Sequence, residues 1–136
     1  MAVWGVSETS RHNIGSSTPW EDVAGYSRAV RIGDQVFVSG TTAHDESGNL
    51  QGGHDAYAQA AYILRKIATA LQQAGASLED VVRTRIYVVR LEDWRDVSRA
   101  HGDVFGHIRP ANTLVQVAGL VDGPLVEIEA DAVIQR

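Results

Sequence analysis

The feature that most limits how this chain can fold is a 20-residue segment, 55–74, that carries a single apolar stripe. Its apolar residues recur at steps of three and four, which is the spacing of one face of an α-helix. They are Tyr57, Ala60, Leu64, Ile67, Ala68 and Leu71. Gly75 follows where helices commonly end in a left-handed residue, and Ser77 and Asp80 are spaced to cap a short turn. Such a helix must bury its stripe against a second layer.

A second helix and several strands are predicted to supply that layer. Apolar residues at helical spacing predict a helix from Glu92 or Asp93 towards Phe105. Runs of β-branched and aromatic residues predict strands over 26–32, 35–39, 81–90, 112–118 and 126–134, the first two joined by a tight turn at Gly33-Asp34. The order β-β-α-β-α-β-β predicts an α/β (α+β) two-layer sandwich with two helices on one sheet face.

The predicted strand over 81–90 indicates what the two sheet faces meet. By alternation, Val82, Thr84, Ile86 and Val88 share one side, which we expect to meet the helices. Arg83, Arg85 and Tyr87 share the other side. That mixture suits an oligomer interface with a polar pocket better than a dry core.

Composition excludes several classes of protein. The chain has 136 residues, 44% of them hydrophobic, and no cysteine, so thiolate metal sites and a thiol nucleophile are excluded. A net charge of −5 opposes broad attraction to nucleic acid. No stretch has the run of about 20 apolar residues that a membrane helix needs, and we expect a cytoplasmic protein. Residues 1–20 are expected to form an irregular arm, and residues 21–136 a single domain.

Four segments carry a resemblance to a known family. They are Arg31-Ile-Gly-Asp-Gln-Val-Phe-Val-Ser-Gly40, Ala74-Gly-Ala-Ser-Leu-Glu-Asp-Val-Val82, Arg109-Pro-Ala-Asn112, and Val126-Glu-Ile-Glu-Ala130. In this order they resemble the Rid (reactive intermediate deaminase, YjgF-like) family, also labelled endoribonuclease L-PSP. The resemblance runs from about Tyr26 to Ile134.

The resemblance implies a chorismate-mutase-like fold, assembled as a homotrimer with clefts between subunits. Active members hydrolyse enamines or imines, such as 2-iminopropanoate, to a 2-keto acid and ammonia without a metal or an organic cofactor. The resemblance therefore predicts a small-molecule ligand and no cofactor for this chain.

Four positions fit the pattern of active members. Tyr26 matches a tyrosine of the cleft, Ser39 and Gly40 match a strand end that offers hydroxyl and backbone groups, and Glu127 matches the cleft carboxylate. We expect Glu127 to position or activate the hydrolytic water, with Glu129, on the same strand face, as the alternative.

Two positions depart from the pattern. Asn112 stands where active deaminases carry an arginine that pairs with the substrate carboxylate, and Leu114 stands where many carry a cysteine. A guanidinium grips a carboxylate through two charge-assisted hydrogen bonds, whereas an amide offers neutral donors. The departure predicts a changed substrate and weak or absent activity on standard 2-imino acids.

The lost positive charge has three candidate replacements. Arg85 is favoured because its strand face is expected to turn towards the subunit interface, and Arg28 and Arg109 are the others. The histidines form no compact ligand set, so no metal site is predicted. His101, on the stripe of the second helix, is expected to be a core or interface residue with one satisfied nitrogen.

Two functions of different classes remain open. One is a hydrolase of an enamine, an imine or a related small metabolite. The other is a non-catalytic trimer that binds a small ligand or partner in the same clefts. RNA cleavage is less favoured, because the chain is acidic and has no aromatic-and-basic array.

Overall fold

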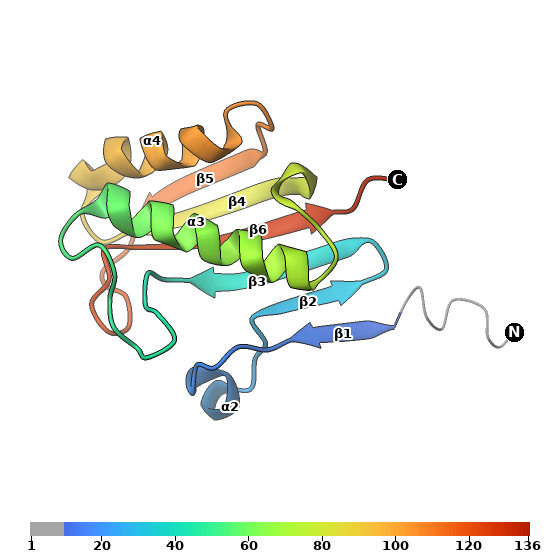
Figure 1. Cartoon of the computed structure of the whole chain (residues 1–136). Helices are drawn as coiled ribbons and strands as arrows, with labels where there is room; N and C mark the ends of the chain where they lie inside the picture. Colours follow the sequence, from blue (N-terminus) through green and yellow to red (C-terminus); the bar gives the residue numbers. More distant parts are fainter. Residues whose placement is uncertain (1–9) are drawn as a thin grey trace, which may run out of the picture.

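The computed structural model of the protein describes residues 10–136, so Trp4 and the rest of 1–9 lie outside it. Six strands form one sheet in the order β1-β2-β3-β6-β4-β5, and α3 and α4 cover one face of it (Figure 1). The strands are β1 (Arg11–Ile14), β2 (Ala29–Ile32), β3 (Gln35–Thr41), β4 (Val81–Val88), β5 (Ala111–Gln116) and β6 (Val126–Val133). The helices are α2 (Trp20–Ala24), α3 (Ala56–Gln73) and α4 (Trp94–Phe105). The predicted two-layer fold is confirmed.

Strand pairing explains why α4 lies where it does. β4 and β5 are parallel, whereas the other neighbouring pairs are antiparallel. A parallel pair needs a crossover connection, and α4 supplies it on the covered face of the sheet. The β2–β3 hairpin closes through Gly33-Asp34, with Ile32 opposite Gln35, as predicted.

The ends of α3 follow the expected capping chemistry. The Asp55 side chain accepts a hydrogen bond from the Ala58 N–H at 3.1 Å, which satisfies a donor that the first turn leaves unpaired. After the helix, Gly75 takes φ 82°, where a Cβ would also lie 2.6 Å from Nη1 of Arg31. Ser77 and Asp80 form the predicted capping box.

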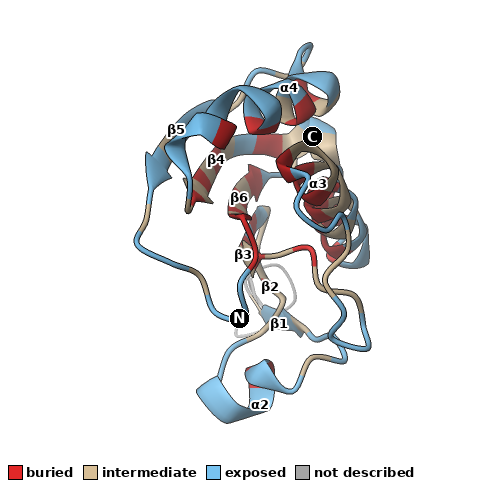
Figure 2. Ribbon diagram, turned by 90° about the vertical axis from the view of Figure 1, so that its left-hand side faces the viewer, coloured by how far each residue is buried: buried red, intermediate tan, exposed pale blue. Residues whose placement is uncertain are grey.

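The core lies between the helices and the sheet. Figure 2 shows the buried residues of α3 and α4 turned towards the strands. The largest fully buried apolar side chains of the core are Ile63, Leu64, Ile67, Leu71, Val97, Phe105, Val36, Ile86, Val88, Val126 and Ile128. The stripe read from 55–74 therefore does face the sheet, although Tyr57 and Ala68 are only half-buried at its margins.

Two sequence expectations need correction. Arg11–Ile14, expected to be irregular, pairs as β1 with β2, and Trp20–Ala24 forms a short helix. Val82 was expected to face the helices but is 45% exposed, while Val81 is buried. A register shift between Val81 and Arg83 against β6 breaks the alternation, which is regular again from Thr84 onwards.

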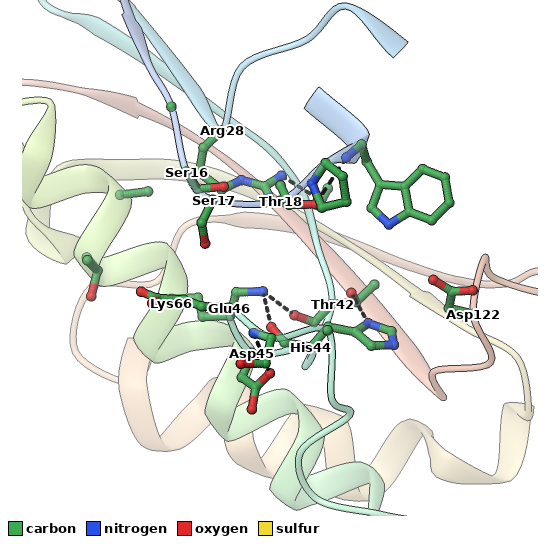
Figure 3. A pocket seen from close by; sticks show the side chains of 18 of the residues that line it. Ser16, Ser17, Thr18, Arg28, Thr42, His44, Asp45, Glu46, Lys66 and Asp122 are labelled. Carbon is green, nitrogen blue, oxygen red and sulfur yellow. Dashed lines mark hydrogen bonds between the residues drawn. The ribbon is translucent and has the colours of Figure 1, made fainter. Parts of the chain in front are cut away.

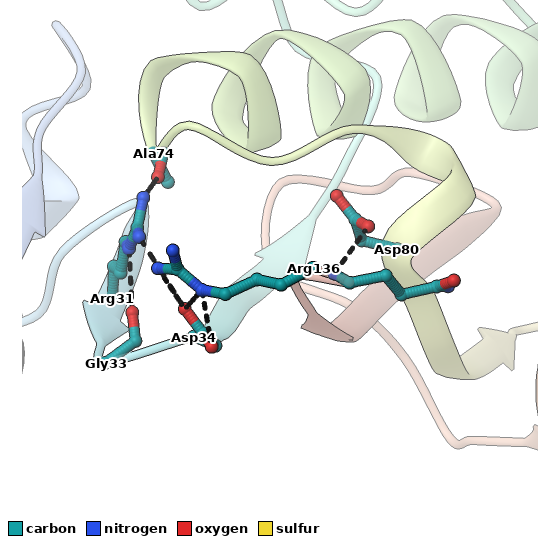
Figure 4. Close-up of polar contacts among 7 residues, drawn as sticks. Arg31, Gly33, Asp34, Ala74, Asp80 and Arg136 are labelled. Atoms are coloured by element: carbon teal, nitrogen blue, oxygen red, sulfur yellow. Dashed lines mark hydrogen bonds and ion pairs between the residues drawn. The ribbon is translucent and has the colours of Figure 1, made fainter.

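Polar contacts fasten the end of the sheet opposite the loops that follow β3 (Figure 4). Arg31 donates to the Gly33 carbonyl and to the Ala74 carbonyl, both at 2.8 Å, and so joins β2 to the end of α3. Arg136 pairs with Asp34 at 2.7 Å. Within residues 10–136, no helix is long and apolar enough to cross a membrane.

Candidate functional site

A pocket of about 870 Å³ opens where β3 leaves the sheet. Its walls are the segment 15–20, the loop 42–48 after β3, one side of α3, and Glu127 of β6 (Figure 3). That volume lies within the range of roughly 300–1,000 Å³ that is usual for small-molecule sites. Of the residues predicted from sequence, the structure brings Tyr26, Gly40 and Glu127 together here.

Glu127 packs directly on the backbone of Gly40. A Cβ added at Gly40 would overlap a carboxylate oxygen and lie 3.0 Å from the carboxylate carbon of Glu127. Burial raises the pKa of Glu127, and the nearby charge of Arg28 opposes that rise in part. A raised pKa brings a carboxyl group closer to the range in which it can both accept and return a proton near neutral pH.

Arg28 enters the pocket from the chain just before β2. Its Nη2 donates to the Gly40 carbonyl at 2.6 Å, and its Nε is buried with no hydrogen-bond partner within the described chain. Burial lowers the pKa of Arg28, with the charges of Glu21 and Glu127 among the influences that oppose the change. Arg28 thus remains a cation, as any arginine does, with unused donor capacity.

Lys66 enters from α3. Its Nζ donates to the carbonyls of Thr42 at 2.8 Å and His44 at 2.7 Å. Burial, followed by the charge of Arg28, lowers the pKa of Lys66 to about 8. Sequence reasoning missed this residue, because one lysine beside the apolar stripe of a helix looks like a solvated charge. Segment 15–20 was also not predicted to form part of the site, because it shows no periodicity that would indicate a structural role.

Tyr26 and Ser39 differ in their access to the pocket. Tyr26 lines the pocket and is 38% exposed, with its ring 6.0 Å from the guanidinium carbon of Arg28. Ser39 does not line it, because its hydroxyl donates to the Ser27 carbonyl at 2.6 Å. In this chain Ser39 therefore fastens β3 to the segment before β2.

Asn112 and Leu114 lie on β5, at the far edge of the sheet, and do not line the pocket. The Asn112 amide donates to the Thr84 hydroxyl at 2.9 Å, and that hydroxyl contacts Nε2 of His101 at 2.8 Å. His101 thus has one nitrogen partnered, as predicted, and burial lowers its pKa. Asn112 and Leu114 lie opposite Thr84 and Ile86 of β4, so their side chains lie on the face of the sheet that the helices cover.

The structure does not bring Arg85 or Arg109 to the pocket. Arg85 lies on the open sheet face and pairs with Glu129 at 3.5 Å and Asp131 at 3.2 Å. Glu129 is further held by the Tyr87 hydroxyl at 2.8 Å, so it is committed to this network. Arg109 takes φ 60° in the loop before β5 and donates to the Gly106 carbonyl. Of the three candidate cations, only Arg28 lines the pocket.

No group of three or more potential metal ligands occurs among residues 10–136. His44, the one histidine that lines the pocket, contacts the Thr42 hydroxyl through Nδ1 at 2.8 Å.

Comparison with known proteins places this geometry in a family. The family model described as endoribonuclease L-PSP matches residues 17–134. The chain belongs to the Rid (YjgF-like) family. The 3-aminoacrylate deaminase RutC of Acinetobacter baylyi is 34% identical over 81% of this chain and 87% of that protein.

Solved structures of Rid-family proteins agree with the fold. The crystal structure of a YjgF/YER057c/UK114 family member from Mycobacterium tuberculosis shares 48% identity and a TM-score of 0.84, covering 92% of this chain and all of that chain. RidA of an Antarctic Psychrobacter shares 34% identity and a TM-score of 0.75, over 80% and 88% of the two chains. The similarity thus extends over most of the Rid domain.

Proposed function

We propose that this Rid-family protein is a cofactor-free hydrolase of an enamine, an imine or a related small metabolite, and that it releases ammonia and a carbonyl product. The observation that carries the proposal is the Glu127 carboxylate, packed on Gly40 inside a pocket of small-molecule size. The similarity to a 3-aminoacrylate deaminase supports the reaction class.

Glu127 would act as the acid–base group. In imine hydrolysis, water adds to the C=N carbon, and the resulting carbinolamine loses ammonia to leave a C=O group. Glu127 would take the proton from the attacking water and return a proton to the leaving nitrogen. Both steps need a carboxyl group that exchanges protons readily, and burial raises the pKa of Glu127 in that direction.

The working cleft is proposed to form between subunits of a homotrimer. In one chain β5 carries Asn112 and Leu114 at the sheet edge, away from Glu127 on β6, with β4 between them. A neighbouring subunit would have to bring these two residues to the pocket. The open sheet face, where Arg85, Tyr87, Glu129 and Asp131 are half-exposed, has the mixed polarity of an interface.

Asn112 is proposed to change the substrate. An amide in place of a guanidinium removes a fixed charge from that side of the cleft. It also donates to Thr84 within its own chain, so part of its donor capacity is already used. We therefore expect turnover of 2-iminopropanoate to be weak or absent, because no cation at position 112 orients its carboxylate for the reaction.

The test is ammonia release from a panel of imines and enamines that are generated in situ, each compared with its spontaneous hydrolysis. Acceleration of at least one substrate supports the proposal. A small ligand that raises the melting temperature, with no acceleration of any substrate, would instead favour the non-catalytic binding protein.

A further inference from the structure

We infer that Arg28 and Lys66 together form a carboxylate-binding subsite within the pocket, on the wall made by the chain after β3. The inference rests on the proposed function only in naming the substrate class: the ligand carries an acidic group that this chain grips with its own two cations.

The two cations are fixed along one short stretch of backbone. Arg28 donates to the carbonyl of residue 40, and Lys66 donates to the carbonyls of residues 42 and 44. These carbonyls belong to alternate residues that run from the end of β3 into the loop after it. Figure 3 shows Arg28 and Lys66 reaching this wall from different elements. Positioning of this kind holds two positive charges next to the same space.

Neither cation has an ion-pair partner in the described part of the chain. Within residues 10–136, no carboxylate lies close enough to Arg28 or Lys66 to form an ion pair. Both are half-buried, and both are hydrogen-bonded only to backbone carbonyls. Burial of a charge that has no ion-pair partner is unfavourable, and burial is the main cause of the lowered pKa values of both groups. An acidic ligand would supply the missing counter-charge.

Donor capacity also remains at the subsite. An ammonium group has three N–H donors, and Lys66 uses two of them on carbonyls. The Nε of Arg28 is buried, so the guanidinium must meet a ligand through its Nη groups, of which Nη2 already donates to the Gly40 carbonyl. A carboxylate has two oxygens that can accept from such donors, which makes it a suitable counterpart.

The pocket's carboxylates do not cancel this charge. Asp45 is occupied by its own loop, because it accepts from the N–H groups of Ser47 and Asn49, both at 2.9 Å, and from the Gln51 amide. Glu46 and Asp122 are exposed, where water screens their charge. The charges of Glu21 and Glu127 act on Arg28 from nearby, but neither carboxylate forms an ion pair with it, and the Glu127 carboxylate lies against Gly40.

The test compares binding of 2-oxobutanoate with binding of its neutral analogue 2-oxobutanamide by isothermal titration calorimetry near pH 7. We expect the natural protein to bind the acid about 10-fold or more tightly than the amide. In Lys66→Gln, affinity for the acid should fall by about 10- to 100-fold, while affinity for the amide changes little. Arg65→Gln is the matched control, since it removes a positive charge from the neighbouring position of α3 outside the pocket wall.

Three results would overturn the inference. They are no binding of the acid to the natural protein, equal affinity for acid and amide, or an unchanged affinity for the acid in Lys66→Gln. Thermal unfolding of each variant confirms that it is folded, and the acid–amide comparison in the natural protein does not depend on any variant. Ammonia release is measured separately. Lys66-dependent binding of the acid without turnover of any substrate would support the subsite and refute the proposed hydrolase. Turnover without a preference for the acid over the amide would support the hydrolase and refute the subsite.

Discussion

Replacing Gly40 with alanine tests whether the position of the Glu127 carboxylate matters to the reaction. The added methyl group would stand 3.0 Å from the carboxylate carbon and overlap one of its oxygens. Carbon atoms that are not bonded settle at about 3.5–4.0 Å. The carboxylate must therefore retreat by about 0.5–1 Å.

The retreat should affect turnover far more than folding. The atoms that the methyl group meets belong to the end of a flexible side chain, so the fold can absorb it by a small rotation. A displacement of about 1 Å in a catalytic geometry can lower a rate by roughly 100-fold. We expect Gly40→Ala to lose about 10- to 100-fold in kcat/KM, with a melting temperature close to that of the natural protein.

The assay is ammonia release from the best substrate of the panel, with circular dichroism on the same samples. Gly119→Ala is the control, because a Cβ at Gly119 meets nothing within 4 Å. Full activity in a well-folded Gly40→Ala protein would refute the reasoning, since the carboxylate would then work equally well when displaced.

Three further predictions concern the cleft, the pH dependence and the core. Asn112→Arg should strengthen calorimetric binding of 2-oxobutanoate by about 10- to 100-fold, and equal affinities in two folded proteins would show that position 112 does not face the ligand. Turnover should fall as the pH is lowered through the raised pKa of Glu127, which must lose its proton to act as a base, and turnover that does not fall on the acid side would contradict that assignment. Binding of 2-oxobutanoate should weaken as the pH rises through about 8, where Lys66 loses its charge, and an affinity that stays constant up to about pH 9 would contradict the role of Lys66. Ile67→Ala should lower the free energy of unfolding by about 2–5 kcal/mol in urea titrations, because Ile67 is fully buried, and a loss below about 1 kcal/mol would mean that the core collapses around the gap.

The elements predicted from sequence were those with strong local signals. The stripe of α3, the capping box of Ser77 and Asp80, and the Gly33-Asp34 turn are each specified by neighbouring residues. β1 was missed because Arg11–Ile14 is a mostly exposed edge strand, and only its pairing with β2 orders it. Val82 is exposed because of a register shift between β4 and β6, and no local sequence pattern reveals such a shift.

The candidate site was only partly predictable for the same reason. Glu127 and Gly40 were named from the resemblance, and the structure places one against the other. The favoured cation, Arg85, was chosen by strand parity alone, and its pairing with Glu129 and Asp131 of the neighbouring strand β6 was not visible in the sequence. Lys66 is held at the pocket by hydrogen bonds to the carbonyls of Thr42 and His44, which lie more than 20 residues away in the sequence, so no local pattern could reveal its role.

The measurement that tests the central claim most directly is the rate of ammonia release by Glu127→Gln beside that of the natural protein on the same substrate. The glutamine keeps the shape of the side chain but cannot exchange the proton, so we predict a loss of at least about 100-fold in kcat, the lower end of the usual contribution of an acid–base group. Glu92→Gln, an exposed position outside the pocket, should keep the natural rate. A Glu127→Gln protein that is folded and releases ammonia at the natural rate would contradict the claim that Glu127 carries the reaction.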